Sequence, residues 1–147
     1  MHYPTVGALL AVAMLSACAS GPKYTEVKSA IPALAPDSGR IYFYRSANMF
    51  GSGIQPSVVL NGEKVGDSVP GGFFFVDRVP GNQEVTLSTE VDKKLTFVLE
   101  RNQDKYVRMS VGLGVIVYRV YPELIDPATA ESEMRDLSFT GSIPKSK

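Results

Sequence analysis

The sequence predicts a mainly β protein, an antiparallel β-sandwich of about seven strands with one short C-terminal helix, preceded by a signal peptide and a tether. Three observations predict this fold. Short runs of β-branched and aromatic residues recur between residues 40 and 121. Glycine, proline and asparagine turn signals separate these runs. Helical signals are confined to residues 127–136. An open β-barrel is the alternative arrangement of the same strands.

The first predicted strand is Arg40–Arg45, in which Ile41 and Phe43 face the core and the tyrosines take the opposite face. Residues 48–55 contain two glycines and are predicted as a loop. Residues 57–60 and 63–66 are predicted to pair as a hairpin. Between them, Asn61-Gly62 supplies the two positive φ angles of a type I′ turn.

The remaining predicted strands cover residues 73–79, 83–89, 94–100, 106–111 and 115–121. A short helix is predicted from Pro127 to Asp136. Asp126 is a favourable N-cap for it, and proline suits the first helical position.

The N-terminal segment has the features of an export signal. Residues 6–15 are apolar but too few to span a bilayer, which needs about 20 residues. Leu15, Ser16, Ala17 and Cys18 resemble the lipobox of bacterial lipoproteins. The resemblance implies cleavage before Cys18, diacylglycerol transfer to its thiol, and acylation of the new amine. An ordinary secreted protein cut after Ala17 or Ala19 is the alternative.

We therefore expect a lipoprotein signal peptide at 1–17, the lipidated cysteine and a flexible tether at 18–38, a β-sandwich domain at 39–141 and a frayed tail at 142–147. Pro22, Pro32 and Pro36 prevent a continuous helix in the tether. Its reach is about 65 Å fully extended and about 25 Å as a relaxed coil. The residue after the cysteine is Ala19 rather than Asp, which resembles lipoproteins exported onward to the outer membrane.

Composition excludes several function classes. Fifteen basic and fifteen acidic residues balance, so the basic surface that nucleic-acid binding requires is not expected. His2 is the one histidine and Cys18 the one cysteine, so the processed chain would contain no histidine and no unmodified thiol. That excludes Ser-His-Asp and Cys-His catalysis and the usual ligands of zinc, copper and haem. We expect no catalytic residue, no metal and no cofactor.

Four features are candidates for contact or binding. Phe73 and Phe75 could line a pocket between the sheets with Val115, or one face of Phe73–Phe75 could be exposed and contact lipid or a partner. A strand buried on both faces is the simpler interpretation. Residues 111–117 are predicted as a buried strand bent at its glycines, with a membrane-contacting loop as the alternative. A calcium site at Asp126, Glu131 and Glu133 would need more oxygen ligands at fixed loop spacing, so helix capping and solvation are the preferred explanation of these acidic residues. An anion-binding patch would need three arginines to meet, namely Arg45, Arg78 and Arg119.

Three segments carry a family resemblance: GRIYFYR at 39–45, residues 58–87, and ELIDPATAESEM at 123–134. Together, over roughly residues 23–137, they resemble the DUF2846 family, small bacterial lipoproteins of unknown function. The central segment is also similar to PEGA-type modules, in which a hairpin such as LNGEKVG precedes a strand, a Pro-Gly turn and another strand. The resemblance implies a β-sandwich used for binding or scaffolding, and it supplies no catalytic residue.

The leading functional hypothesis is a non-enzymatic lipoprotein on the periplasmic side of the outer membrane. It would be held by acyl chains on Cys18 and act by contact with an envelope protein or glycan. The second hypothesis is a small-molecule or lipid-binding module with a pocket between the sheets. The third is a carboxylate-based hydrolase of envelope polymers, which would need two acidic side chains facing each other across a groove.

Overall fold

The computed structural model describes residues 18–116 and 118–141, which form nine strands in two sheets with two short α-helices and one 3-10 helical turn. The five-stranded sheet has the order β8 (Tyr118–Ile125), β7 (Asp104–Leu113), β1 (Gly39–Tyr44), β4 (Gly72–Arg78) and β9 (Ser138–Phe139). The four-stranded sheet has the order β3 (Glu63–Asp67), β2 (Ser57–Leu60), β5 (Gly81–Ser88) and β6 (Asp92–Leu99). The predicted fold class is confirmed. The expected signal peptide, residues 1–17, and the expected tail, residues 142–147, lie outside the described residues.

Two strand pairings differ from the antiparallel pattern that the sequence predicts. β1 pairs in parallel with β7, and β4 pairs in parallel with β9. The other pairings are antiparallel. Parallel neighbours join segments far apart in the chain, so no local turn signal announces them.

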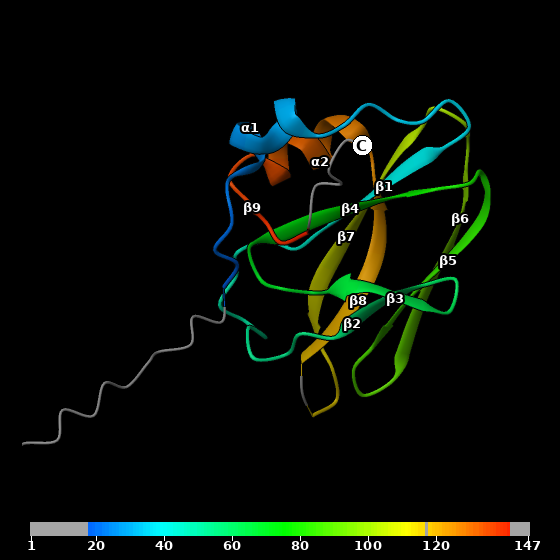
Figure 1. The fold of residues 1–147 in the computed structure, drawn as a ribbon. Helices are drawn as coiled ribbons and strands as arrows, with labels where there is room; N and C mark the ends of the chain where they lie inside the picture. The colour runs from blue at the N-terminus through cyan, green and yellow to red at the C-terminus, as the bar shows by residue number, and fades with distance from the viewer. Residues whose placement is uncertain (1–17, 117, 142–147) are drawn as a thin grey trace, which may run out of the picture.

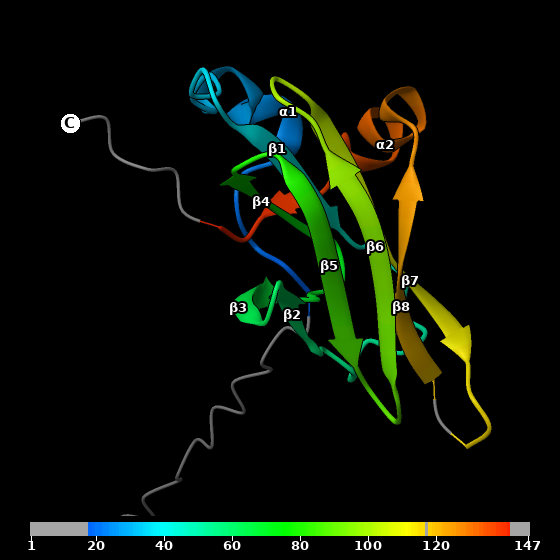
Figure 2. The same ribbon diagram turned by 90° about the vertical axis from the view of Figure 1, so that its right-hand side faces the viewer.

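The two helices, α1 (Tyr24–Val27) and α2 (Pro127–Met134), lie together against the five-stranded sheet. In Figures 1 and 2 they occupy the upper end of the molecule, away from the tip of the β7–β8 hairpin. The side chain of Asp126 accepts a hydrogen bond from the Thr129 backbone N–H at 3.0 Å, which confirms the predicted N-cap of α2. This bond lowers the pKa of the Asp126 carboxyl.

All six residues of β1 are buried because the five-stranded sheet is covered on both faces, by the four-stranded sheet on one side and by the helices on the other. Phe43 stacks on Phe74 at 5.1 Å, and Phe74 packs against Gly66 of β3, so this face meets the four-stranded sheet. On the other face, Tyr42 stacks on Tyr106 at 5.0 Å and lies edge-on to Tyr24 of α1. The predicted alternation in β1 is therefore confirmed, and so is the burial of Phe73 and Phe74 on opposite faces.

The β2–β3 hairpin forms where the sequence predicts it. Asn61 and Gly62 both have positive φ angles, of 51° and 84°. Asn61 also donates from its side chain to Gln83 at 2.7 Å and accepts from the Glu84 backbone at 2.8 Å, which fixes the turn to β5.

The expected flexible tether is corrected by the structure over part of its length. Tyr24 and Val27 are buried, and they share one side of the helical turn because they are three residues apart. The backbone N–H of Tyr24 donates to Leu137 at 2.9 Å, and that of Phe139 donates to Pro22 at 2.8 Å. Pro22 and Pro32 flank a short helical segment, α1 followed by a 3-10 turn at Lys28–Ala30, and this segment carries enough apolar surface to dock on the sheet.

The predicted strand 115–121 is also corrected. β8 begins only at Tyr118, and Val115 and Ile116 lie exposed in the preceding loop. At its other end β8 continues to Ile125 through Pro122. An edge strand tolerates proline because one side of its backbone has no strand to pair with.

Candidate functional site

A polar groove of about 480 Å³ opens beside the edge of the five-stranded sheet and α2. Its walls come from β1, β7, β8, α2 and the loop after β1. They are formed by Tyr44, Ser46, Asn48, Arg108, Met109, Ser110, Val111, Tyr121, Glu123 and Glu133.

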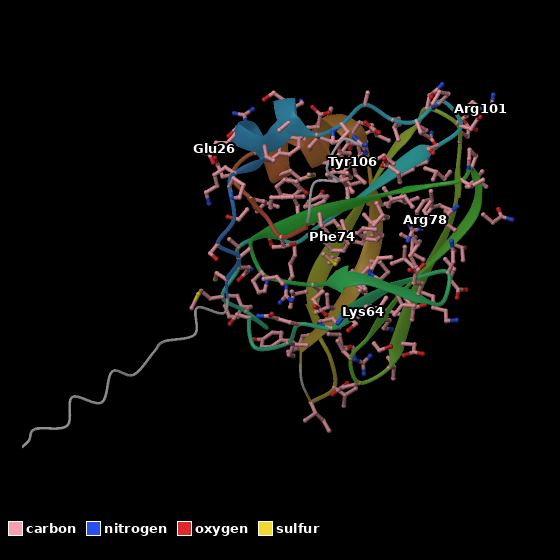
Figure 3. The ribbon with its side chains drawn as sticks, viewed as in Figure 1. Glu26, Lys64, Phe74, Arg78, Arg101 and Tyr106 are labelled. Atoms are coloured by element: carbon pink, nitrogen blue, oxygen red, sulfur yellow. The ribbon has the colours of Figure 1, made fainter. Side chains whose placement is uncertain are left out.

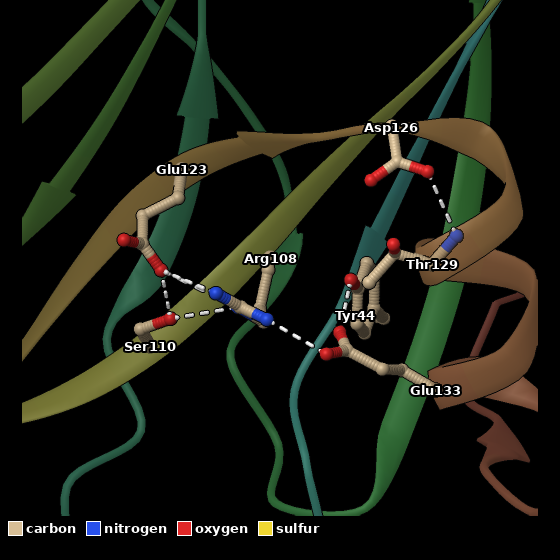
Figure 4. Close-up of polar contacts among 7 residues, drawn as sticks. All are labelled: Tyr44, Arg108, Ser110, Glu123, Asp126, Thr129 and Glu133. Carbon is tan, nitrogen blue, oxygen red and sulfur yellow. Dashed lines mark hydrogen bonds and ion pairs between the residues drawn. The ribbon is translucent and has the colours of Figure 1, made fainter.

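Five of these side chains form one hydrogen-bonded network, the Arg108 cluster: Tyr44, Arg108, Ser110, Glu123 and Glu133 (Figure 4). Arg108 donates from Nη1 to Glu133 Oε1 at 2.7 Å and from Nη2 to Glu123 Oε2 at 3.2 Å. The Tyr44 hydroxyl donates to Glu133 Oε2 at 2.5 Å, and Ser110 bonds to Glu123.

The strand register builds this cluster. Arg108 of β7 lies directly opposite Glu123 of β8. Ser110 is two residues further along β7, so its side chain shares the face of Arg108. The N-cap at Asp126 starts α2 so that Glu133, near its C-terminal end, reaches both Tyr44 of β1 and Arg108.

Electrostatics hold the cluster together. Burial lowers the pKa of Arg108, but its bonds to the two glutamates outweigh burial and leave that pKa raised. Burial raises the pKa of Tyr44, and the bond to Glu133 raises it further, so Tyr44 acts as a hydrogen-bond donor. One guanidinium serves two carboxylates, which leaves an excess of negative charge at the groove.

The two carboxylates of the Arg108 cluster have no open space between them. Glu123 and Glu133 do share a groove, as the third hypothesis requires, but the guanidinium of Arg108 lies between them (Figure 4). The space in which a glycosidic bond would have to sit is therefore filled by a side chain. Asn48, Ser46 and the edge of the Arg108 cluster instead offer hydrogen-bonding groups to a polar partner.

The structure does not bring Arg45, Arg78 and Arg119 together, so the prediction of an anion-binding patch is wrong. Arg45 is buried at the end of β1, whereas Arg78 pairs with Gly39 at its opposite end. Arg78 lies on the far side of the molecule from the start of the described chain (Figure 3) and contacts Glu63 at 3.6 Å. Arg119 is bound to Glu90 at 2.9 Å. Each arginine has a separate set of partners.

The predicted pocket of Phe73, Phe75 and Val115 is not formed either. Phe73 and Phe75 face the helices and C-terminal strand, where each contacts the ring of Phe139. Phe75 also lines a cavity of about 500 Å³ beside β3, without the other two. Val115 lies in the β7–β8 loop with 87% of its surface exposed. The hypothesis of a small-molecule or lipid-binding module therefore has no pocket formed by the three residues from which it was argued.

The acidic residues near the C-terminus separate into three roles. Asp126 caps α2, Glu133 belongs to the Arg108 cluster, and Glu131 contacts Lys28 at 3.3 Å and Tyr106 at 3.2 Å. Within residues 18–116 and 118–141, no group of three or more His, Cys, Asp or Glu side chains is placed to hold a metal ion. No helix in the same part of the chain is long and apolar enough to cross a membrane.

Sequence reasoning missed Arg108, Ser110 and Glu123. One signal was present: Arg108 lies inside a run that otherwise reads as a buried strand, and a charge in such a position requires a partner. The sequence does not identify this partner, because Glu123 lies beyond the end of the last predicted strand, residues 115–121.

Cys18, the predicted lipid attachment point, is exposed at the start of the described chain. The next residue is already fixed to the domain, since the Ala19 N–H donates to the Pro70 carbonyl at 3.0 Å. Leu15, Ser16 and Ala17, the rest of the predicted lipobox, lie outside the described residues.

Comparison with known proteins gives one family. The sequence pattern described as "Protein of unknown function (DUF2846)" matches residues 35–120, more than half of the chain. Neither a curated protein nor a solved structure matches the sequence or the fold. The matched region holds β1 to β7, all of the four-stranded sheet and the start of β8. The chain therefore belongs to the DUF2846 family.

Proposed function

We propose that this protein is a lipid-anchored component of the bacterial envelope that acts by contact rather than catalysis, on the periplasmic side of the outer membrane. One observation carries the proposal. The lipobox-like run Leu15 to Cys18 ends at the residue from which the chain enters the folded domain. An exposed cysteine at that point is accessible for acylation without disturbing the core.

The anchor is strong enough to hold the domain at a membrane. Each buried methylene contributes about 0.8 kcal/mol, and while one acyl chain binds only marginally, two or three give durable attachment. Confinement to a surface also raises the local concentration of partners, so weak contacts become frequent.

The groove at the Arg108 cluster is the proposed contact site on the domain. It presents carboxylate, amide and hydroxyl groups from rigid elements, which suits a polar envelope protein or glycan. Because Arg108 occupies the space between Glu123 and Glu133, this arrangement supports binding over the hydrolase alternative.

Metabolic labelling with palmitate tests the anchor. We expect the wild-type chain to incorporate label in a Gram-negative host, and Cys18→Ala to lose it completely because the thiol is the site of transfer. Intact mass measurement of the processed protein is the companion readout. An unmodified Cys18 sulfur in protein from its native membrane would refute the proposal.

A further inference from the structure

Two loops gather exposed apolar side chains at one end of the molecule, and they define the apolar tip: Met49, Phe50, Leu113, Val115 and Ile116. These side chains are 79%, 64%, 82%, 87% and 87% exposed. Residues 46–62 and 109–118 contain no Asp, Glu, Lys or Arg. Large apolar side chains grouped in this way on a domain surface mark a contact with a protein or a membrane.

The two loops belong to one surface. The ring of Phe50 lies 6.1 Å from that of Tyr118, at the base of the β7–β8 loop. The backbone of Gly51 also lies close to Val111 and Tyr118. Arg45 holds the first loop in place by donating to the carbonyls of Gly51 and Ile54 at 2.8 and 2.6 Å.

The same surface continues to the anchor. Ala19 is hydrogen-bonded to Pro70, and the neighbouring Gly71 donates to the carbonyls of Arg45 and Ser46, where the first apolar loop begins. In Figures 1 and 2 the start of the described chain and the β7–β8 loop both lie in the lower part of the molecule, below the helices. Cys18 is one residue from a fixed point, and consecutive Cα atoms are only about 3.8 Å apart.

We infer that the apolar tip inserts into the lipid surface to which Cys18 is anchored, as a second membrane contact that orients the domain. The inference rests on the proposed lipid anchor. No flexible linker separates the acylated Cys18 from the domain, so the bilayer must lie against the face around Cys18. That face carries the apolar tip, which makes a lipid surface its occupant.

The residues behind the tip fit the same occupant. Tyr118 and Tyr121 follow the apolar loop, and Lys93 and Arg119 line a groove of about 390 Å³ that also includes Leu113. Lys93 adds a basic group beside these aromatic rings, and aromatic and basic side chains are the types that lie at the headgroup level of a bilayer. Val91 at the β5–β6 turn is also exposed, but Glu90 and Asp92 beside it keep it outside the tip.

Single-cysteine labelling of the acylated protein tests the inference. In the lipidated chain the Cys18 sulfur is a thioether, so Ile116→Cys introduces the one reactive thiol. Val79→Cys is the matched control, because Val79 is 77% exposed in the turn after β4, beside Arg78 on the far side. Each variant is purified from membranes, labelled with an environment-sensitive fluorophore and reconstituted into phosphatidylethanolamine–phosphatidylglycerol vesicles.

We expect the label at position 116 to be shifted to the blue, quenched by spin-labelled lipid and shielded from acrylamide, while the label at 79 stays in water. Adding Leu113→Asp should raise the acrylamide accessibility of position 116 about tenfold, because it removes one leucine side chain that insertion would bury in the lipid. Leu113 is itself exposed, so this change leaves the core intact.

Three other outcomes would overturn the inference in distinguishable ways. Equal exposure of both labels on acylated protein would refute insertion and leave the anchor standing. Shielding from acrylamide without quenching by lipid would assign the tip to a second copy or another protein. A wild-type protein whose Cys18 reacts with the fluorophore would refute the anchor, and with it the inference.

Discussion

Arg45 shows how one residue can fix the geometry of a whole loop. Its side chain is only 1% exposed, and its guanidinium donates to the carbonyls of Gly51, Ile54 and Ser68. Burial lowers the pKa of this arginine. Its partners among the described residues are neutral oxygens, so Arg45 acts as a clamp between β1, the loop 46–56 and the turn before β4.

We predict that Arg45→Met lowers the free energy of unfolding by about 2 to 4 kcal/mol, because one buried and two partly buried carbonyls lose a charged donor. Urea unfolding of the purified protein measures this. Arg101→Met is the control, since Arg101 is 67% exposed and its pair with Asp37 contributes about 0 to 1 kcal/mol. Equal losses in the two variants would contradict the clamp.

The arginines also mark a limit of sequence reasoning at this scale. Arg45, Arg78 and Arg119 are the same residue type near predicted strands, and nothing local distinguishes them. Their partners are carbonyls in one case and single glutamates in the others, all distant in sequence or set by loop geometry. The two carboxylate partners of Arg108 are also distant in sequence. Strand register brings Glu123 to it, and the position of α2 brings Glu133.

At the scale of elements, local signals predicted the β2–β3 hairpin and α2. Asn61-Gly62 and Asp126-Pro127 each specify a backbone conformation within a few residues. The sequence does not predict α1 and β9, because elements of four and two residues carry too little pattern and depend on contacts with each other and with the five-stranded sheet. The β7–β8 loop was misread because an apolar run between strands resembles a buried strand.

We predict that Tyr24→Ala releases the segment around α1 from the domain and lowers stability by about 3 to 5 kcal/mol, as for other buried aromatic residues. Tyr24 is 4% exposed and packs edge-on against Phe73 at 5.3 Å. Limited trypsin digestion should then cut faster after Lys23 and Lys28. Thr25→Ala, on the exposed side of the same turn, should leave both readouts unchanged; cleavage at the wild-type rate in Tyr24→Ala would argue against docking.

At the scale of the whole molecule, the outer face of the five-stranded sheet is a layer of buried aromatic rings. Tyr24, Tyr42, Tyr44 and Tyr106 all have less than a tenth of their surface exposed. Burial raises the pKa of each phenol, that of Tyr24 from 10.0 to about 12. The folded state therefore binds these protons more tightly than the unfolded chain does.

From this we predict loss of stability at alkaline pH. Above pH 10 the unfolded chain releases its tyrosine protons while the fold retains them, so the free energy of unfolding falls as pH rises from 10 to about 12. Each fully buried tyrosine contributes a slope of up to about 1.4 kcal/mol per pH unit. Urea midpoints and tyrosinate absorbance measure the effect; Tyr24→Phe should show a shallower fall, and a constant midpoint over this range would disprove it.

The pairing of Pro22 and Tyr24 with Leu137 and Phe139 places the two ends of the described chain side by side. If the chain is exported from its N-terminus and acylated as proposed, these contacts form only after Phe139 has crossed the inner membrane. Acylation of Cys18 would then precede the docking of residues 22–24 on the domain. A product truncated before Leu137 would keep its acyl chains but lose the contacts that orient the domain relative to them, so attachment and orientation would be acquired at separate stages.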